Sequence, residues 1–390
     1  MNFDKLTKYL DSVSETFGIP ACDMQVTVGD EIVYRHSAGF RDAAGTEKVR
    51  EDDLYRIFSC TKVMTMFAVM QLIEQNKLGL YDKVSDYLPA YKIMRVSDEF
   101  DFRHPEKMPK KTDRCHIAHN EIRIVDLMTM TAGMSYDIGS DVMQEYIAAN
   151  PAADTQALVS AMAKMPLLYE PGTRMRYSLA HDVLAAVIEV VSGEKYSDYL
   201  RNHLFGPLGT TDFYFLLDEE QAKRMSQAYD ADPRTGRKIP KEGSLTSALR
   251  FSENYESGGG GMITTVDAYS KVVQAVANGG VGANGVRILS EDSVRLFTNR
   301  YTFGQLQEDF DRMEKPGCSY GLGVYVITDN EGLRTPAGVF GWDGAAGAYT
   351  MIDPFNKISI TYMHHILGFP IVYTDEHPVI REMVYEALGL

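Results

Sequence analysis

The sequence predicts an α+β protein in which one antiparallel sheet is assembled from both ends of the chain, with a mainly helical region inserted between them. Two short β-type runs near the start meet at Gly29-Asp30, which is typical of a hairpin. The last third of the chain holds four more strand-like runs, and a turn at Asp353-Pro354 separates the final two. The six predicted strands cover residues 22–28, 31–38, 321–328, 337–342, 346–353 and 357–363.

Helical patterns flank and join these strands. Apolar residues recur every three or four positions at residues 3–17, 59–77 and 377–388, and a further helix follows the glycine run 258–261. These periodic segments predict helices that open the chain, follow the hairpin and close the chain.

The region between the two groups of strands predicts a separate helical unit. Between residues 88 and 255 helical patterns alternate with loops, and the polar stretch 91–120 is irregular enough to be an excursion or lid. We therefore expect a discontinuous sheet domain at residues 1–87 and 266–390. A helical domain at residues 88–265 would complete the protein, with the active site in the cleft between the two.

The composition is that of a folded protein that handles small molecules. The 390 residues are 45% hydrophobic, and the net charge of −15 disfavours nucleic acid and anionic membranes as partners. The first residues lack an apolar signal core, and no stretch is long enough to span a bilayer. Four scattered cysteines without a Cys-x-x-Cys pair suit a reducing cytosol. We expect a cytoplasmic protein without a nucleic-acid or membrane partner; its oligomeric state is left open.

One short motif suggests covalent catalysis. Ser59-Cys60-Thr61-Lys62 lies where an extended apolar run becomes a helical pattern. A serine needs a base to become a nucleophile, and a lysine three positions later lies on the same helix face. A helix N-terminus and a dry pocket both favour the neutral amine, which can accept the proton.

Other patterns in the chain are better explained as structure. A second Ser-x-x-Lys match, Ser192 to Lys195, falls at the predicted C-terminal end of a helix. Ser319 lies in a Gly-x-Ser-x-Gly sequence, but a strand pattern follows it where a nucleophile elbow requires a helix. His116 and His119 have metal-ligand spacing; their polar setting favours a loop on which no carboxylate converges, so no metal or cofactor is expected.

Several motifs together give a family resemblance. After Ser59-x-x-Lys62 come, in order along the chain, Leu127-Met128-Thr129-Met130-Thr131-Ala132-Gly133-Met134, Glu170-Pro171-Gly172-Thr173, Tyr177-Ser178, Leu204-Phe205-Gly206-Pro207-Leu208-Gly209 and Trp342-Asp343-Gly344. In these motifs and their order the chain resembles the serine β-lactamase and penicillin-binding-protein superfamily, in its class C-like branch. The resemblance implies a β-lactamase-like fold.

The resemblance also implies site residues. It makes Ser59 the nucleophile, Lys62 its activating partner and Tyr177 a group that accepts and donates protons, with a phenolate favoured by neighbouring ammonium groups. The backbone N–H groups of Ser59 and Ala345 would form the oxyanion hole.

Two departures from the family pattern suggest a neutral substrate. Leu179 replaces the asparagine that binds a β-lactam amide, and Trp342 replaces the cation that binds a substrate carboxylate. Trp342, Asp343 and Gly344 would line the substrate site, with the glycine allowing close approach to the backbone. These features resemble the family VIII carboxylesterases and the lovastatin-type acyltransferases.

Three functions remain open from the sequence. The first is a serine esterase or acyltransferase that cleaves small esters through an acyl-enzyme on Ser59. The second is a class C-like β-lactamase or D-Ala-D-Ala carboxypeptidase acting on a β-lactam-like substrate. The third is a non-catalytic binder, which the intact set of Ser59, Lys62 and Tyr177 argues against.

Overall fold

The main sheet joins the two ends of the chain. The computed structural model describes residues 1–241 and 251–390. Seven strands follow the order β10-β11-β12-β13-β14-β1-β2, and each neighbouring pair is antiparallel. The junction is the β1–β14 pair, in which Asp23 lies opposite Met363 and Val28 opposite Ile358. The strands are β1 Ala21–Val28, β2 Glu31–Gly39, β10 Cys318–Tyr320, β11 Tyr325–Ile327, β12 Phe340–Asp343, β13 Tyr349–Asp353 and β14 Ile358–Met363.

This arrangement confirms the predicted sheet and differs from it in detail. The predicted strand at 321–328 is shortened to β11 because the N–H of Gly321 donates to the carbonyl of Val324 and closes a turn. The residues before that turn form β10, which the sequence did not predict. Strand β10 has only three residues, too few for a period-2 pattern to show.

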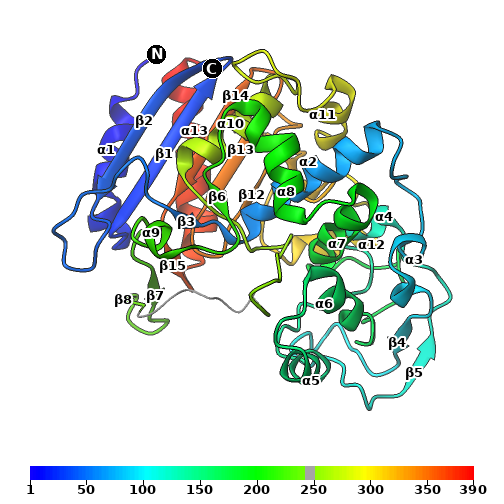
Figure 1. Cartoon of the computed structure of the whole chain (residues 1–390). Helices are drawn as coiled ribbons and strands as arrows, with labels where there is room; N and C mark the ends of the chain where they lie inside the picture. Colours follow the sequence, from blue (N-terminus) through cyan, green and yellow to red (C-terminus); the bar gives the residue numbers. More distant parts are fainter. Residues whose placement is uncertain (242–250) are drawn as a thin grey trace.

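Helices cover both faces of the sheet. Helix α1 (Asp4–Phe17) buries Leu6, Leu10 and Val13, and it packs against β2 and against α13 (His377–Leu388). Figure 1 shows α1 and α13 on one side of the sheet and α10 (Val266–Ala277) on the other. Helix α10 packs on β1, β13 and β14, which explains why these strands are buried almost throughout.

A group of helices gathers beside one end of the sheet (Figure 1). Helix α7 (Ala180–Ser192) is its centre and packs against α2 (Thr61–Glu74), α3, α4, α6 and α8. The bounds of the remaining α-helices of the described residues are α3 Val84–Tyr87, α4 Ile124–Met128, α5 Asp141–Ala149, α6 Thr155–Met162, α8 Tyr196–Leu200, α9 Glu219–Ala222, α11 Glu291–Phe297 and α12 Gln305–Asp311. Of these, α9 and α11 lie outside the group (Figure 1). The predicted domain boundaries at residues 88 and 265 stay a prediction.

Small sheets complete the fold. A hairpin of β4 (Arg95–Ser97) and β5 (Cys115–Ile117) lies within the predicted excursion 91–120. Two three-stranded sheets connect distant segments, in the orders β3-β9-β6 and β15-β7-β8. Their strands are β3 Tyr55–Arg56, β6 Phe213–Tyr214, β7 Tyr229–Ala231, β8 Lys238–Pro240, β9 Ile263–Thr264 and β15 Ile366–Leu367. Within residues 1–241 and 251–390, no helix has the length and apolar character needed to cross a membrane.

Candidate active site

The candidate nucleophile lies in a tight turn that leads directly into α2. Ser59 is the middle residue of the 3-10 turn Phe58–Cys60, and its side chain lies at the N-terminal end of α2. Phe58 has a φ of +45°, a backbone conformation that costs a residue with a side chain about 1–3 kcal/mol. The turn is held from outside, because the thiol of Cys60 donates to the carbonyl of Trp342. Surrounding structure therefore fixes a strained turn that presents Ser59.

Lys62 is the buried base next to this serine. Its Nζ lies 3.5 Å from the Ser59 Oγ, donates to the carbonyl of Gly259 and sits 4.5 Å from the centre of the Tyr177 ring. The side chain is fully buried. Burial lowers the pKa of Lys62 to about 7, against an opposing effect of the Asp182 carboxylate. An amine with this pKa is half neutral near physiological pH and can accept the serine proton.

Asp182 is a charged group of the site that the sequence interpretation missed. It lies in the first turn of α7, is buried, and accepts hydrogen bonds from the hydroxyls of Tyr255 (2.6 Å) and Ser257 (2.5 Å). Its carboxylate favours the ammonium form of Lys62 and so limits the fall in the pKa of that lysine. No motif indicates this role, because Asp182 falls within an ordinary helical pattern.

The glycine run at 258–261 passes close to the side chains of Lys62 and Asp182. A Cβ at Gly259 would lie 2.5 Å from the Asp182 carboxylate and 3.4 Å from the Lys62 Nζ. A Cβ at Gly258 would lie 2.4 Å from the carbonyl of His181. The backbone can therefore pass between α2 and α7, and offer a carbonyl to Lys62, only without side chains at these positions.

Tyr177 stands in a stack of aromatic rings facing Lys62. Its ring centre is 5.4 Å from that of Tyr136 and 5.6 Å from that of Trp342, with the rings nearly parallel in both pairs. Burial raises the pKa of Tyr177 well above its usual value, while the nearby Ser59 hydroxyl acts in the opposite direction. The expectation of a favoured phenolate is wrong: Tyr177 is a neutral phenol at neutral pH, because desolvation by burial is the largest effect on its pKa.

The third motif borders the nucleophile turn. The Trp342 ring forms one side of the aromatic stack, and Ala345 is an exposed residue of the turn after β12. A Cβ at Gly344 would lie 2.2 Å from the carbonyl of Ile57. A glycine is therefore required here because the backbone packs directly against the segment that precedes Ser59, whether or not a substrate also approaches it. The places of Ser59 and Ala345 are compatible with a shared oxyanion hole, which stays a prediction.

A family model described as Beta-lactamase matches residues 6–381, which is nearly the whole chain. The chain belongs to the Beta-lactamase family. Among curated relatives, Protein Rv1367c of Mycobacterium tuberculosis is 28% identical over 376 residues, covering 93% of this chain and 90% of the relative. Esterase EstB of Burkholderia gladioli is 26% identical over 353 residues, covering 85% and 82%. The solved structure of "EstCE1, a hydrolase with promiscuous acyltransferase activity" superposes with a TM-score of 0.76 at 22% identity, covering 98% and 97%.

This member of the Beta-lactamase family brings only part of the predicted site together. Ser59, Lys62, Tyr177 and Trp342 share one cluster, as the distances above show. Leu179 is completely buried at the start of α7. Its role as a substrate-binding residue stays a prediction.

Asp343 is engaged away from this cluster. Its carboxylate accepts from the Nδ1 of His377 at 2.7 Å and pairs with the ammonium of Lys315. These two groups hold the pKa of Asp343 down at about 2 against the effect of burial. The three residues line a cavity of about 360 Å³ together with Tyr349, Tyr373 and Arg381. The Tyr373 hydroxyl donates to the carbonyl of Gly344 at 3.0 Å, so this cavity adjoins the third motif.

The patterns set aside at the sequence level have the expected structural settings, with one exception. Ser192 ends α7 before Gly193, and Ser319 lies in β10 and is followed by another strand. The expectation that no carboxylate converges on His116 and His119 is wrong. The carboxylate of Glu170 lies within hydrogen-bonding distance of both imidazoles.

Proposed function

We propose that this protein is a serine esterase that forms an acyl-enzyme on Ser59. The observation that carries the proposal is the buried Lys62 amine, 3.5 Å from the Ser59 Oγ, with its pKa lowered to about 7. Family membership and the similarity to Esterase EstB support ester hydrolysis as the chemistry. The acyl acceptor is water or a second alcohol, and the promiscuous acyltransferase activity of EstCE1 supports including the latter.

The proposed proton transfers follow the opposite pKa shifts of Lys62 and Tyr177. Lys62 takes the proton of Ser59 while the Oγ bonds to the ester carbonyl carbon. The N–H groups of Ser59 and Ala345 hold the resulting oxyanion. When the tetrahedral intermediate collapses, the carbon–oxygen bond to the alcohol breaks and the neutral phenol of Tyr177 protonates the leaving oxygen. The Lys62 ammonium returns a proton to Tyr177, so both groups end as they began, and the acceptor deacylates Ser59 by the same route.

The surroundings favour neutral esters over anionic amides. Tyr136, Tyr177 and Trp342 form an aromatic wall, and Trp342 offers no charge to a substrate carboxylate. A hydrogen bond to a charged group is worth about 1.5–3 kcal/mol, roughly tenfold to a few hundredfold in selectivity. A β-lactamase or carboxypeptidase activity remains the second candidate. Cytoplasmic location is part of the proposal and rests on the scattered free cysteines.

The test compares kcat/KM for p-nitrophenyl butyrate and for nitrocefin, and locates the acyl-enzyme. The ester should be preferred, and a fluorophosphonate probe should label Ser59 in a peptide map. Ser59→Ala should abolish turnover and labelling, whereas Ser192→Ala and Ser319→Ala should retain both. A label on Ser319 would overturn the assignment of the nucleophile, and a nitrocefin value equal to the ester value would favour the second candidate.

A further inference from the structure

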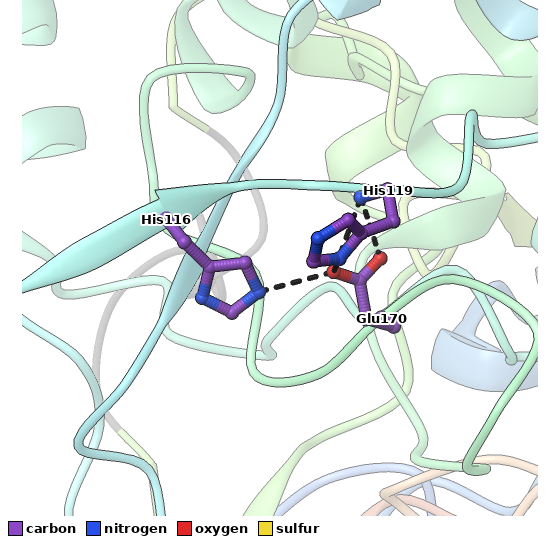
Figure 2. A group of neighbouring side chains, drawn as sticks. All are labelled: His116, His119 and Glu170. Carbon is purple, nitrogen blue, oxygen red and sulfur yellow. Dashed lines mark hydrogen bonds and ion pairs between the residues drawn. The ribbon is translucent and has the colours of Figure 1, made fainter.

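Three side chains from distant parts of the sequence converge at the surface of the helical region. His116 lies in β5, His119 follows that strand, and Glu170 begins the turn that leads toward Tyr177 (Figure 2). The Glu170 Oε1 lies 3.0 Å from the Nε2 of His116 and 2.8 Å from the Nδ1 of His119. These three ligand atoms all lie within 4.8 Å of one another.

The group is held in place by contacts outside it. The carboxylate of Asp98 binds the Nδ1 of His116 at 2.6 Å, so the Nε2 is the nitrogen that faces the other two side chains. The backbone N–H groups of His119 and Asn120 donate to Glu170 at 3.0–3.2 Å and fix its carboxylate. A carboxylate behind a histidine is the arrangement that orients imidazoles toward metal ions in proteins.

We propose that His116, His119 and Glu170 bind one first-row transition-metal ion of the zinc type, with Asp98 as a positioning residue. Two imidazoles and one carboxylate suit such an ion, whereas calcium and magnesium prefer oxygen donors only. Donors bound to a tetrahedral zinc ion at ~2.0–2.2 Å lie about 3.3 Å apart, so the two distances from the Glu170 Oε1 to the imidazole nitrogens must lengthen by only a few tenths of an ångström. The ion replaces the two hydrogen bonds from the imidazoles to Glu170.

The burial of the three ligands predicts an exchangeable site. The side chain of His119 is 80% exposed, that of His116 39% and that of Glu170 21%, so the ion keeps at least one water ligand. The bound ion would tie the predicted excursion 91–120 to the turn at Glu170-Pro171, seven residues before Tyr177. Its role is therefore to stabilise the segment that positions Tyr177, independent of the esterase proposal.

The buried trio His364, Glu376 and His377 must be distinguished from this site, because its ligand atoms also lie close together. All three residues are almost completely buried, and the Nδ1 of His377 is taken by Asp343. A metal that binds there would require opening of the core. Variants of His116, His119 and Glu170 show which of the two groups binds the ion without disturbing that core.

The test uses the untagged full chain, stripped of metal by a chelator and titrated with Zn²⁺ or Co²⁺. We expect one ion per chain by calorimetry, a visible Co²⁺ absorption band of four- or five-coordinate type, and a higher Tm. His119→Gln should weaken binding at least 100-fold and Asp98→Asn about 10–100-fold. His203→Gln is the matched control, since that partly exposed imidazole also pairs with a glutamate, Glu194, at 2.7 Å.

Two results would overturn the proposal. One is the absence of stoichiometric Zn²⁺ or Co²⁺ binding to the parent protein at micromolar concentrations. The other is binding that survives in both His119→Gln and Glu170→Gln, which would place the ion elsewhere. Because His119 is exposed, its variant should have the same metal-free Tm as the parent protein, and that measurement separates lost ligation from lost folding.

Discussion

Replacing Lys62 by methionine should stabilise the protein while it removes activity, and the stabilisation should depend on pH. Burial moves the pKa of Lys62 from 10.5 to about 7, which corresponds to a penalty on the charged amine of about 5 kcal/mol. Methionine fills the same space without a charge. The parent protein loses free energy of unfolding either by burying a charged ammonium or by releasing its proton on folding. The variant avoids both costs and should therefore be more stable.

The sign and the pH window follow from proton binding. Between pH 7 and 10.5 the unfolded chain holds the lysine proton and the folded protein does not, so the stability of the parent protein rises with pH. The loss of folding stability caused by burying the Lys62 amine reaches its full value of about 5 kcal/mol below pH 7 and falls to about 2 kcal/mol at pH 9. The stabilisation by Lys62→Met should thus be about 3 kcal/mol larger at pH 6 than at pH 9.

Urea unfolding at the two pH values measures this difference. The variant leaves the Gly259 carbonyl without its donor at a cost of about 1–3 kcal/mol, but this cost is the same at both pH values and cancels. Equal m values in variant and parent make the free energies comparable. Lys195→Met is the matched control, since this lysine ends the other Ser-x-x-Lys sequence but its side chain is 50% exposed and paired with Glu256. A Lys62→Met effect that is the same at pH 6 and pH 9 would refute the assignment of Lys62 as a neutral base.

Three further predictions concern catalysis. The value of kcat/KM for p-nitrophenyl butyrate should rise with pH through about 7 and then level off, and Asp182→Asn should move this midpoint to lower pH because the carboxylate favours the ammonium. An unchanged midpoint would exclude the electrostatic role of Asp182. Lys62→Met and Tyr177→Phe should each lower kcat about 100-fold or more, and the double variant by much less than the product; near-normal kcat in Tyr177→Phe would remove it from the proton path. Trp342→Lys should raise the ratio of kcat/KM for nitrocefin to kcat/KM for the ester. Leu179→Asn changes a fully buried position and should chiefly lower Tm. An unchanged ratio in Trp342→Lys would show that this residue does not set specificity.

The parts of the fold that the sequence predicted are those with a strong local pattern. The predicted closing helix at 377–388 coincides with α13, and the hairpin at Gly29-Asp30 coincides with β1 and β2. The spacing of apolar residues over ten or more positions can be read within one segment, so it predicts the element without knowledge of what the segment packs against. Strand β10 has no such length, so only its pairing with β11 makes it a strand.

The parts of the site that the sequence could not predict depend on contacts between distant residues. Ser59 and Lys62 are one helical turn apart, so their proximity could be inferred from spacing. His116 and Glu170 are separated by 54 positions, and nothing in either segment indicates the other. The phenolate expected for Tyr177 is wrong for a similar reason, because its burial depends on how distant segments pack, and the two rings that stack on it, Tyr136 and Trp342, lie far away in the sequence.

The features that would make this site reactive are also features that cost stability. A left-handed Phe58, a buried Lys62 amine and a buried Tyr177 hydroxyl without a partner of good hydrogen-bond geometry among the described residues are all unfavourable in a folded protein. They lie together at the junction of α2, α7 and β12, and elsewhere both faces of the main sheet are covered by helices that turn an apolar face toward it. Sequence rules for stability fail at a cluster of this kind because selection for function opposes selection for stability there. A variant that removes one of these features should therefore gain stability and lose turnover together, whereas a variant in the core of α10 should lose stability without a specific effect on the acylation step.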